Sequence, residues 1–310
     1  WYPTESMLEP QLKTATILTV SIGTLSLISA LSIVISIIYL KYYRSTSHRL
    51  ILYLALADIF QSFAVVTGYK WLYLGKLDGS DPSCQFQGFM FTFGDNASAF
   101  WSACICIYVV SYGFFNKTIP YFEFIAHGVC WGLPFFFAAI AFAIPGSGNI
   151  YGPIGIWCWI TEEYDLARLY LQYLYLAIIF VFLTIMYSFM AVRLRQLAKN
   201  PHHVNTEREK EKLFRVMKKL LGYPITFFCV FMPLAMQRFS QSCGTQPPFN
   251  YFVFAACFFV SNGFWNSVVY GTTRQIYKRV FYHVTGRKSF VAPSSPSQEK
   301  TQDNNSLATS

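Results

Sequence analysis

Long apolar stretches separated by short polar segments dominate this chain. A helix needs about 20 apolar residues to cross a bilayer, because each residue rises about 1.5 Å through hydrocarbon about 30 Å thick. The pattern therefore predicts an all-α membrane protein, a seven-transmembrane-helix bundle over residues 14–272. The predicted spans are 14–41, 50–73, 84–115, 121–144, 167–192, 214–240 and 250–272.

The composition fits a chain whose outer surface faces lipid, since 54% of the residues are hydrophobic and 13% are charged. Residues 1–13 form a short extracellular N-terminus that is too polar for a signal peptide, so we expect the first span to direct its own insertion. Because the chain opens at Trp1, we expect an initiator Met and some leading residues to precede it. The apolar face at 273–285 predicts a short amphipathic eighth helix at the interface. The Ser-, Pro- and Gln-rich segment 286–310 predicts a disordered cytoplasmic tail.

Most of the 24 Lys and Arg residues fall in alternate connecting segments. The positive-inside rule assigns those segments to the cytoplasm. It therefore predicts a multi-pass plasma-membrane protein with its N-terminus outside and its C-terminus inside. The net charge of +9 then faces anionic membrane lipids, and nucleic acid is not an expected partner.

Three cysteines lie on the predicted outer side, which is oxidising. Cys84 opens the third span and Cys158 lies in the second outer loop, so a bridge between them would hold that loop over the bundle. Sequence does not fix connectivity, but we expect this pair ahead of the alternatives. Cys243 is then left as a free thiol or pairs within an outer loop.

Polar residues inside the spans indicate a possible network at mid-membrane depth. Asp58 in the second span and Asn262 in the seventh lie at similar depths, which predicts a hydrogen-bonded pair. Such a pair acts either as a structural clasp between helices or as a switch or ion site. Asn266 and Tyr270, one turn apart, extend the candidate switch network at the inner end of the seventh span.

Polar side chains in the outer half of the bundle are candidates for binding a ligand. Lys70 and Arg168 also lie near outer span ends, but we expect them to extend toward the interface instead. We expect Tyr173 and Trp71 in the interfacial aromatic belt. The candidate ligand-binding residues are Asp95, Asn96, Gln172, Gln237, Arg238 and Asn250.

Basic residues cluster at the predicted inner ends of the fifth and sixth spans. They either fix the topology or form the surface that contacts a cytoplasmic partner. Pro224 and Pro233 interrupt the sixth span and predict a point at which its inner half can move. The basic residues are Arg193, Arg195, Arg215, Lys218 and Lys219.

This arrangement resembles a G-protein-coupled receptor. The Asn-Pro-x-x-Tyr motif of those receptors maps onto Asn266, Ser267 and Tyr270, with Ser in place of Pro. The inner end of the third span, 106–112, has no Asp-Arg-Tyr triplet, so the rhodopsin-like class fits poorly. The run Cys158-Trp159-Ile160 is similar to the second outer loop of secretin-like receptors and of the slime-mould cyclic-AMP receptors.

The resemblance is closest to the cyclic-AMP-receptor-like group, because secretin-like receptors carry a large disulfide-rich N-terminal domain and we expect none before the first span here. It implies a heterotrimeric G protein as partner and a small extracellular ligand. Resemblance to this group implies cyclic AMP as the ligand, but the sequence shows no recognisable cluster of phosphate-binding residues. The expected ligand is therefore cyclic AMP or another small molecule.

Other functional classes fit the sequence less well. Within the spans, His127 is the one histidine, which does not make a zinc site, and 250–272 holds no lysine for a retinal Schiff base. We therefore expect no enzyme activity, no metal and no cofactor. A heptahelical transporter of a small solute is the alternative, although no internal repeat relates two halves of the chain.

Overall fold

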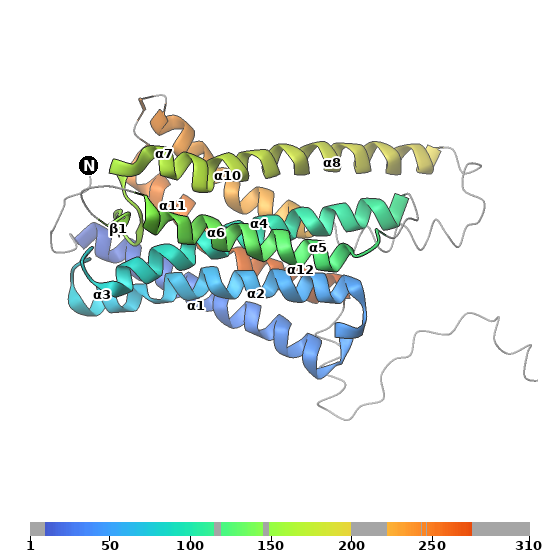
Figure 1. Cartoon of the computed structure of the whole chain (residues 1–310), viewed down its shortest axis with the longest axis horizontal. Coiled ribbons are helices and arrows are strands. Elements are labelled where there is room, and N and C mark those ends of the chain that lie inside the picture. The colour runs from blue at the N-terminus through green and yellow to red at the C-terminus, as the bar shows by residue number, and fades with distance from the viewer. Residues whose placement is uncertain are drawn as a thin grey trace, which may run out of the picture.

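The computed structural model describes residues 10–114, 119–144, 149–199, 222–242, 244–245 and 247–274. The helices form an elongated bundle (Figure 1). The first three spans are α1 (Pro10–Tyr39), α2 (Thr46–Val66) continued by α3 (Gly68–Leu74), and α4 (Pro82–Phe114). The later spans are α5 (Phe122–His127) with α6 (Leu133–Ile140), α7 (Asp165–Arg168) with α8 (Leu174–Lys199), α10 (Gly222–Ser242), and α11 (Phe249–Val260) with α12 (Asn262–Arg274).

Short elements connect and interrupt these helices. An antiparallel hairpin joins the fourth and fifth spans, and Tyr151 pairs with Ile160 in its register. Its strands are β1 (Tyr151–Pro153) and β2 (Cys158–Ile160). Single 3₁₀ turns occupy Tyr42–Arg44, Ala141–Ala143 and Glu162–Tyr164, and π-helical turns occupy Gly128–Gly132 and Leu169–Tyr173.

The apolar lengths confirm an all-α membrane fold. Five helical segments are long and apolar enough to cross a membrane, namely Pro10–Tyr39, Thr46–Leu74, Pro82–Tyr112, Phe122–Ala143 and Glu162–Met190. A sixth arises if α11 and α12, which are bent by 48°, count as one span. The sixth predicted span is described only in part, as α10, because residues 214–221 of that span lie outside the described ranges. This described part is not among the segments that are long and apolar enough to cross a membrane. The seven-helix count therefore stays a prediction.

The two ends of the bundle differ in structure. The end that carries the hairpin, here named the hairpin end, also holds α3, α7 and the start of α1 (Figure 1). The opposite end is closed by Arg49 of α2, which donates to both carboxylate oxygens of Glu123 on α5. Arg49 also donates to the carbonyls of Tyr43 and Arg44, at 3.1 and 3.2 Å. This residue therefore ties the first connecting segment to the fourth span.

The fourth and fifth spans are not continuous α-helices. A π-helical turn contains one residue more than an α-helical turn, so the side chains that follow it face a different direction. In the fifth span this turn is Leu169–Tyr173, at the hairpin end. It turns Tyr173 toward the sixth span.

The seventh span breaks at Ser261, whose hydroxyl donates to the carbonyl of Phe258 at 2.6 Å. Because of the 48° bend, α12 starts with a new direction at Asn262. Asn262 and Asn266 are both buried in the centre of the bundle.

Candidate ligand cavity and polar centre of the bundle

The hairpin is fixed to the bundle by covalent and hydrogen bonds. Cys84 and Cys158 form a disulfide between α4 and β2, which confirms the pairing expected from the sequence. The amide oxygen of Gln87 accepts from the Trp71 indole and from the Cys158 backbone N–H, both at 2.9 Å. The Gln87 amide nitrogen donates to the carbonyl of Ala64 at 2.9 Å. One buried glutamine thus joins the second span, the third span and the hairpin.

Side chains of both strands point into the bundle. Tyr151 donates through its hydroxyl to the Ala138 carbonyl at 3.0 Å, and the Trp159 indole donates to Thr92 at 3.2 Å. Cys158, Trp159 and Ile160 are all buried. The hairpin is therefore a packed part of the bundle and not a free surface loop.

An ion pair closes the connection between α3 and α4. Lys70 donates to Asp81 at 2.5 Å and to the Ser83 hydroxyl at 2.8 Å. The ammonium of Lys70, followed by the backbone N–H of Ser83, lowers the pKa of Asp81 to about 2. Lys70 was expected to extend to the interface, and the structure gives it these two partners in the connecting segment.

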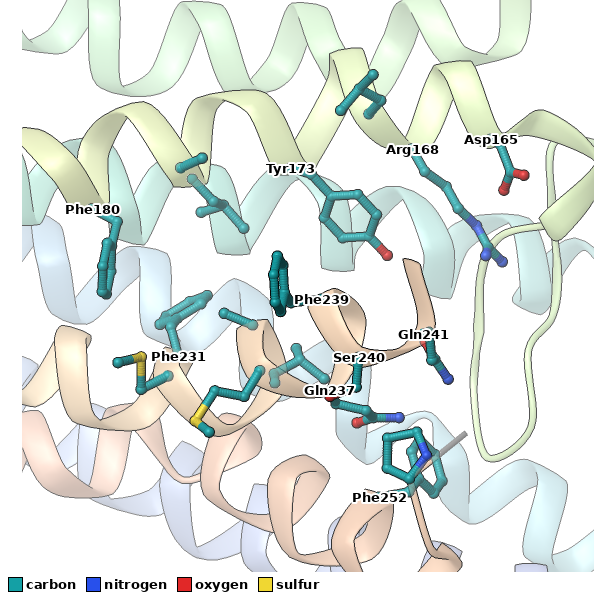
Figure 2. A pocket seen from close by; sticks show the side chains of 18 of the residues that line it. Asp165, Arg168, Tyr173, Phe180, Phe231, Gln237, Phe239, Ser240, Gln241 and Phe252 are labelled. Carbon is teal, nitrogen blue, oxygen red and sulfur yellow. The ribbon is translucent and has the colours of Figure 1, made fainter. Parts of the chain in front are cut away.

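A cavity of about 1560 Å³ opens at the hairpin end between the fifth, sixth and seventh spans. Figure 2 shows Arg168 and Tyr173 on one wall, and Gln237, Ser240 and Gln241 on the facing wall. Phe252 of α11 and Leu12 of α1 also line the cavity. The cavity is large for a small-molecule site, since such sites are typically about 300–1,000 Å³.

The fifth-span wall differs from the sequence expectation. Arg168 does not extend to the interface: it is buried, and its Nε donates to the Ile160 carbonyl at 2.8 Å. Its guanidinium lies 5.5 Å from the Trp159 ring centre and 3.9 Å from Glu162. Tyr173 lines the cavity instead of joining an aromatic belt, because the π-helical turn redirects it. Trp71 is fully buried against the disulfide and is also no belt residue.

The expected ligand-binding residues fall into separate groups. Gln237 is buried and lines the cavity, whereas Asn250 is exposed outside its lining. The side chain of Arg238 lies outside what the structure describes. The aromatic part of the lining, Phe180, Phe227, Phe231 and Phe252, was not expected, because phenylalanines in apolar spans carry no signal that separates cavity wall from lipid contact.

Asp95, Asn96 and Gln172 form a buried cluster between α4 and the fifth span. Gln172 donates to Asp95 at 3.2 Å, and Asn96 donates to the amide oxygen of Gln172 at 3.2 Å and to the Leu171 carbonyl at 3.0 Å. The other oxygen of Asp95 has no hydrogen-bond partner among the described residues. These three residues do not line the cavity, so their contact with a ligand stays a prediction.

Asp58 is the centre of a second polar cluster, which links three spans. One carboxylate oxygen accepts from Ser98 of α4 and from Asn262 of α12, both at 2.8 Å. The other accepts from Asn266 at 2.7 Å, and Asn262 also donates to Ser98 at 3.1 Å. The expected bond between Asp58 and Asn262 is therefore present. Tyr270 is buried one turn beyond Asn266.

Close packing brings α12 to this cluster. A Cβ placed on Gly263 would lie 2.7 Å from the Ser26 hydroxyl and 3.3 Å from Cβ of Asp58. Only glycine therefore fits at this contact among α1, α2 and α12 without a shift of its neighbours. Burial of a carboxylate is costly unless its oxygens are hydrogen bonded, and three donors serve that purpose here.

A multi-pass helical membrane protein with a cavity at one end and a polar cluster at its centre is the class that these features define. The slime mold cyclic AMP receptor family model matches residues 6–305. The chain therefore belongs to this family, which confirms the resemblance drawn from its motifs. The family is one of receptors, so the expectation that the chain is not an enzyme is also confirmed.

Several named receptors are similar to the chain. Cyclic AMP receptor-like protein A of Dictyostelium discoideum is 30% identical over 257 residues, which cover 80% of this chain and 62% of that protein. Ascaroside receptor GPR2 of Arthrobotrys oligospora is 30% identical over 180 residues, covering 56% and 43%. G-protein coupled receptor 157 of Mus musculus is 23% identical over 215 residues, covering 65% and 64%. The chain thus matches less than two thirds of the length of each of these relatives.

Proposed function

We propose that the chain is a G-protein-coupled receptor of the plasma membrane, which binds a small extracellular ligand and activates a heterotrimeric G protein. The observation that carries this proposal is the large cavity at the hairpin end, walled by three spans. Membership of a receptor family and likeness to a named G-protein-coupled receptor support it.

The hairpin end faces the outside in this proposal. Two arguments support that orientation. The positive-inside rule assigns the connecting segments at the opposite end, with Lys41, Arg44 and Arg49, to the cytoplasm. The disulfide between Cys84 and Cys158 lies at the hairpin end, and disulfides persist in an oxidising compartment. A ligand then reaches the cavity from outside.

The sixth span connects ligand binding with the cytoplasmic side. Residues of α10 from Phe227 to Gln241 line the cavity, so a ligand contacts this helix directly. Pro233 lies inside α10 and lacks an N–H, which removes one backbone hydrogen bond and weakens the helix at that point. The Pro233 carbonyl accepts from the Tyr251 hydroxyl at 2.9 Å, which ties the weak point to α11.

Activation then follows by population shift. A ligand that contacts the cavity wall more favourably in one arrangement of α10 stabilises that arrangement. The inner half of the sixth span moves outward and opens a cytoplasmic cleft for the G protein. We assign Asp58, Asn262, Asn266 and Tyr270 to the network that changes between the two arrangements, because they join α2, α4 and α12.

The G-protein surface is assigned to the inner ends of the fifth and sixth spans. Arg193 lies near the end of α8, exposed, with its guanidinium 5.5 Å from the Phe189 ring centre. The side chain of Arg195, all of Arg215, Lys218 and Lys219, and the predicted helix 273–285 beyond residue 274 lie outside the described residues. Their role in coupling rests on their position in the sequence.

The test is nucleotide exchange by purified G proteins in the presence of the receptor in lipid nanodiscs. Candidate ligands, with cyclic AMP among them, are screened for uptake of a non-hydrolysable GTP analogue. We expect at least one ligand to accelerate exchange on one G protein. Empty nanodiscs are the control. Failure of every G protein to respond to any ligand that binds the cavity would contradict the proposal.

A further inference from the structure

The walls of the cavity change from polar to apolar along its length. At the hairpin end the fifth-span wall carries Glu162, Asp165 and Arg168, and the facing end of α10 carries Gln237, Ser240 and Gln241. Further along, the walls carry Leu176, Phe180, Phe227 and Phe231. Figure 2 shows Phe180 and Phe231 on the side away from Asp165 and Arg168.

The apolar part is long. Phe180 follows Arg168 by three turns of helix, which corresponds to roughly 18 Å at 1.5 Å per residue. Because the polar lining residues of both facing walls lie at the same end, the cavity has one end that bears polar groups and one long apolar shaft. From this segregation we propose that the occupant is an elongated amphipathic molecule, with a hydrocarbon chain and an uncharged head that bears hydroxyl groups. The inference rests on the proposed receptor function and names the chemical class of its ligand.

The environment of Gln237 indicates that the head of the ligand donates a hydrogen bond. Its side chain is 2% exposed and lines the cavity, and its amide oxygen has no hydrogen-bond partner among the described residues. A buried acceptor without a donor is unfavourable, so a ligand that brings a donor binds more favourably than one that does not. A hydroxyl group is such a donor. Ser240 and Gln241, in the same wall, place further polar groups beside it.

The charges at the polar end disfavour an ionic head. The guanidinium of Arg168 already donates to the Ile160 carbonyl and lies 3.9 Å from Glu162. An ionic head of either sign would lose its hydration and would meet a like charge as well as an opposite one, either the carboxylates of Glu162 and Asp165 or the guanidinium of Arg168. An uncharged head avoids both repulsions. A cyclic nucleotide, whose phosphate is anionic, therefore matches this polar end poorly.

Exposed apolar side chains in the lining indicate that the cavity also opens sideways, between the fifth and sixth spans. Met236 and Phe239 line it and are 55% and 73% exposed, and Leu169 on the facing helix is 43% exposed. In a bilayer these side chains lie where lipid chains surround the bundle. A hydrocarbon chain thus has a direct path from the outer leaflet into the shaft, which a water-soluble nucleotide does not need.

The first test measures binding of monoacylglycerols, which have a hydroxyl-bearing uncharged head, to the full chain in nanodiscs. Hexanoyl, octanoyl, decanoyl and dodecanoyl glycerol are compared with cyclic AMP, and empty nanodiscs correct for partition into lipid. When affinity is referred to the free ligand in water, we expect it to rise about four-fold for each added methylene until the shaft is filled. Affinity that does not change with chain length, or tighter binding of cyclic AMP than of every monoacylglycerol, would overturn the inference.

Substitutions locate the two parts of the site. Ala177→Trp fills the shaft, and we expect it to weaken decanoyl glycerol at least about ten-fold and hexanoyl glycerol less. Ala143→Trp, at an exposed position that does not line the cavity, is the matched control. Leu176→Phe makes the same comparison with a smaller side chain if Ala177→Trp does not reach the membrane. Equal effects of cavity and control variants would contradict the assignment.

Gln237→Leu tests the head, because leucine keeps much of the volume and removes the acceptor. We expect affinity to fall by about five- to ten-fold for every chain length alike, with no loss of thermal stability. An unchanged affinity would overturn the assignment of the head to Gln237.

Nucleotide exchange separates the two proposals. Binding that depends on chain length, without exchange on any G protein, would support the ligand site and contradict the receptor function. Exchange driven only by cyclic AMP would support the receptor function and contradict the amphipathic ligand.

Discussion

Cys84 and Cys158 are the covalent part of a small buried assembly that also contains Trp71 and Gln87. The disulfide closes a loop that contains the whole fourth span, because the two residues are 74 positions apart. A bridge over so long a loop strongly restricts the unfolded chain. The hairpin, and with it the Ile160 carbonyl that holds Arg168, depends on this bridge for its position.

Replacing either cysteine therefore has a large predicted effect. We expect Cys84→Ser or Cys158→Ser to lower the free energy of unfolding by about 2–5 kcal/mol and to reduce the amount of receptor at the cell surface. Thermal unfolding of the purified variants measures this. Cys257→Ser, at a half-buried free thiol of α11, is the matched control and should change stability far less. Equal midpoints for all three variants would show that the bridge contributes nothing.

Substitution of Asp58 tests whether the polar cluster acts as a switch. The carboxylate accepts bonds on both oxygens, from Ser98 and Asn262 on one and Asn266 on the other. An amide at this position offers one oxygen and places an NH₂ group against a donor. We expect Asp58→Asn to reduce ligand-driven nucleotide exchange about ten-fold or more while most of the protein still folds.

The control for Asp58→Asn lies one turn away on the same helix. Ser62 is equally buried and donates to Ser26 at 3.1 Å, without contact with the Asp58 cluster among the bonds described. Ser62→Ala should leave nucleotide exchange near that of the native chain. If Asp58→Asn lowers surface protein and signal by the same factor, the cluster is a structural clasp instead.

The ion pair of Lys70 with Asp81 predicts a pH dependence. The pKa of Asp81 is about 2 in the folded chain, below its ordinary value of about 3.9, because Lys70 and the Ser83 N–H favour the charged form. Its contribution to stability is therefore complete above about pH 4 and is lost as the pH falls toward 2. We expect the difference in unfolding temperature between the native chain and Lys70→Met to be constant from pH 7 to about pH 5 and to shrink below about pH 4. A difference that stays constant down to pH 2 would contradict this origin.

Between elements, α2 and α4 meet at a contact between backbones that requires glycine. A Cβ added to Gly94 would lie 2.5 Å from the backbone nitrogen of Gln61 and 2.9 Å from its Cα. A backbone cannot move aside as a flexible side chain can. The two helices that carry Asp58 and Ser98 therefore meet at a distance that only glycine permits.

Gly94→Ala should accordingly separate the helices and destabilise the protein by about 1–3 kcal/mol, as overpacking generally does. Gly128→Ala is the matched control, because a Cβ there meets nothing within 4 Å. That control should be neutral or slightly stabilising, since alanine lowers the entropy of the unfolded chain. Thermal unfolding compares the two variants. A Gly94→Ala protein as stable as Gly128→Ala would show that α2 and α4 are not in such close contact.

Element positions were largely predictable from apolar length, but their internal breaks were not. The five segments long enough to cross a membrane agree with the predicted spans within a few residues. The π-helical turn at Leu169–Tyr173 has no comparable sequence signal, because each of its residues is compatible with an α-helix. For that reason Tyr173 was assigned to the interface although it lines the cavity. Arg168 precedes the turn, and it was misassigned because its partner, the Ile160 carbonyl, belongs to a hairpin that the sequence did not predict.

Residues of the candidate site were predictable where burial of a polar group demands a partner. Asp58 and Asn262 could be paired from depth alone, since intramembrane polar groups need partners. Gln237 was also recognised as a polar residue at the mouth of the bundle. The phenylalanines of the shaft were not, because a phenylalanine in a span contacts lipid, another helix or a cavity with the same sequence pattern.

In the whole molecule, the two ends of the bundle have different roles in the proposed function. The hairpin end holds the cavity and the disulfide, and the opposite end holds the junction of Arg49 with Glu123. Asp58 and its partners lie between them. In the proposed function, a signal that starts at the α10 wall of the cavity must therefore change the structure of the opposite end.

The last prediction tests the functional class. Combined reversal of charge at Arg215, Lys218 and Lys219 should lower ligand-driven nucleotide exchange by about ten-fold or more, because the G protein would lose favourable charge contacts. Ligand affinity should stay unchanged, since the sixth-span residues that line the cavity begin at Phe227, about two helical turns after Lys219 in the sequence. Reversal of charge at Lys13 and Lys76 is the control and should leave exchange intact. These residues lie in the N-terminal turn of α1 and in the segment between α3 and α4.

If the triple variant still activates the G protein at the native rate, Arg215, Lys218 and Lys219 only fix the topology. If no G protein responds to either variant or to the native chain, and cells that express it accumulate a solute, the chain is a transporter and the receptor proposal fails.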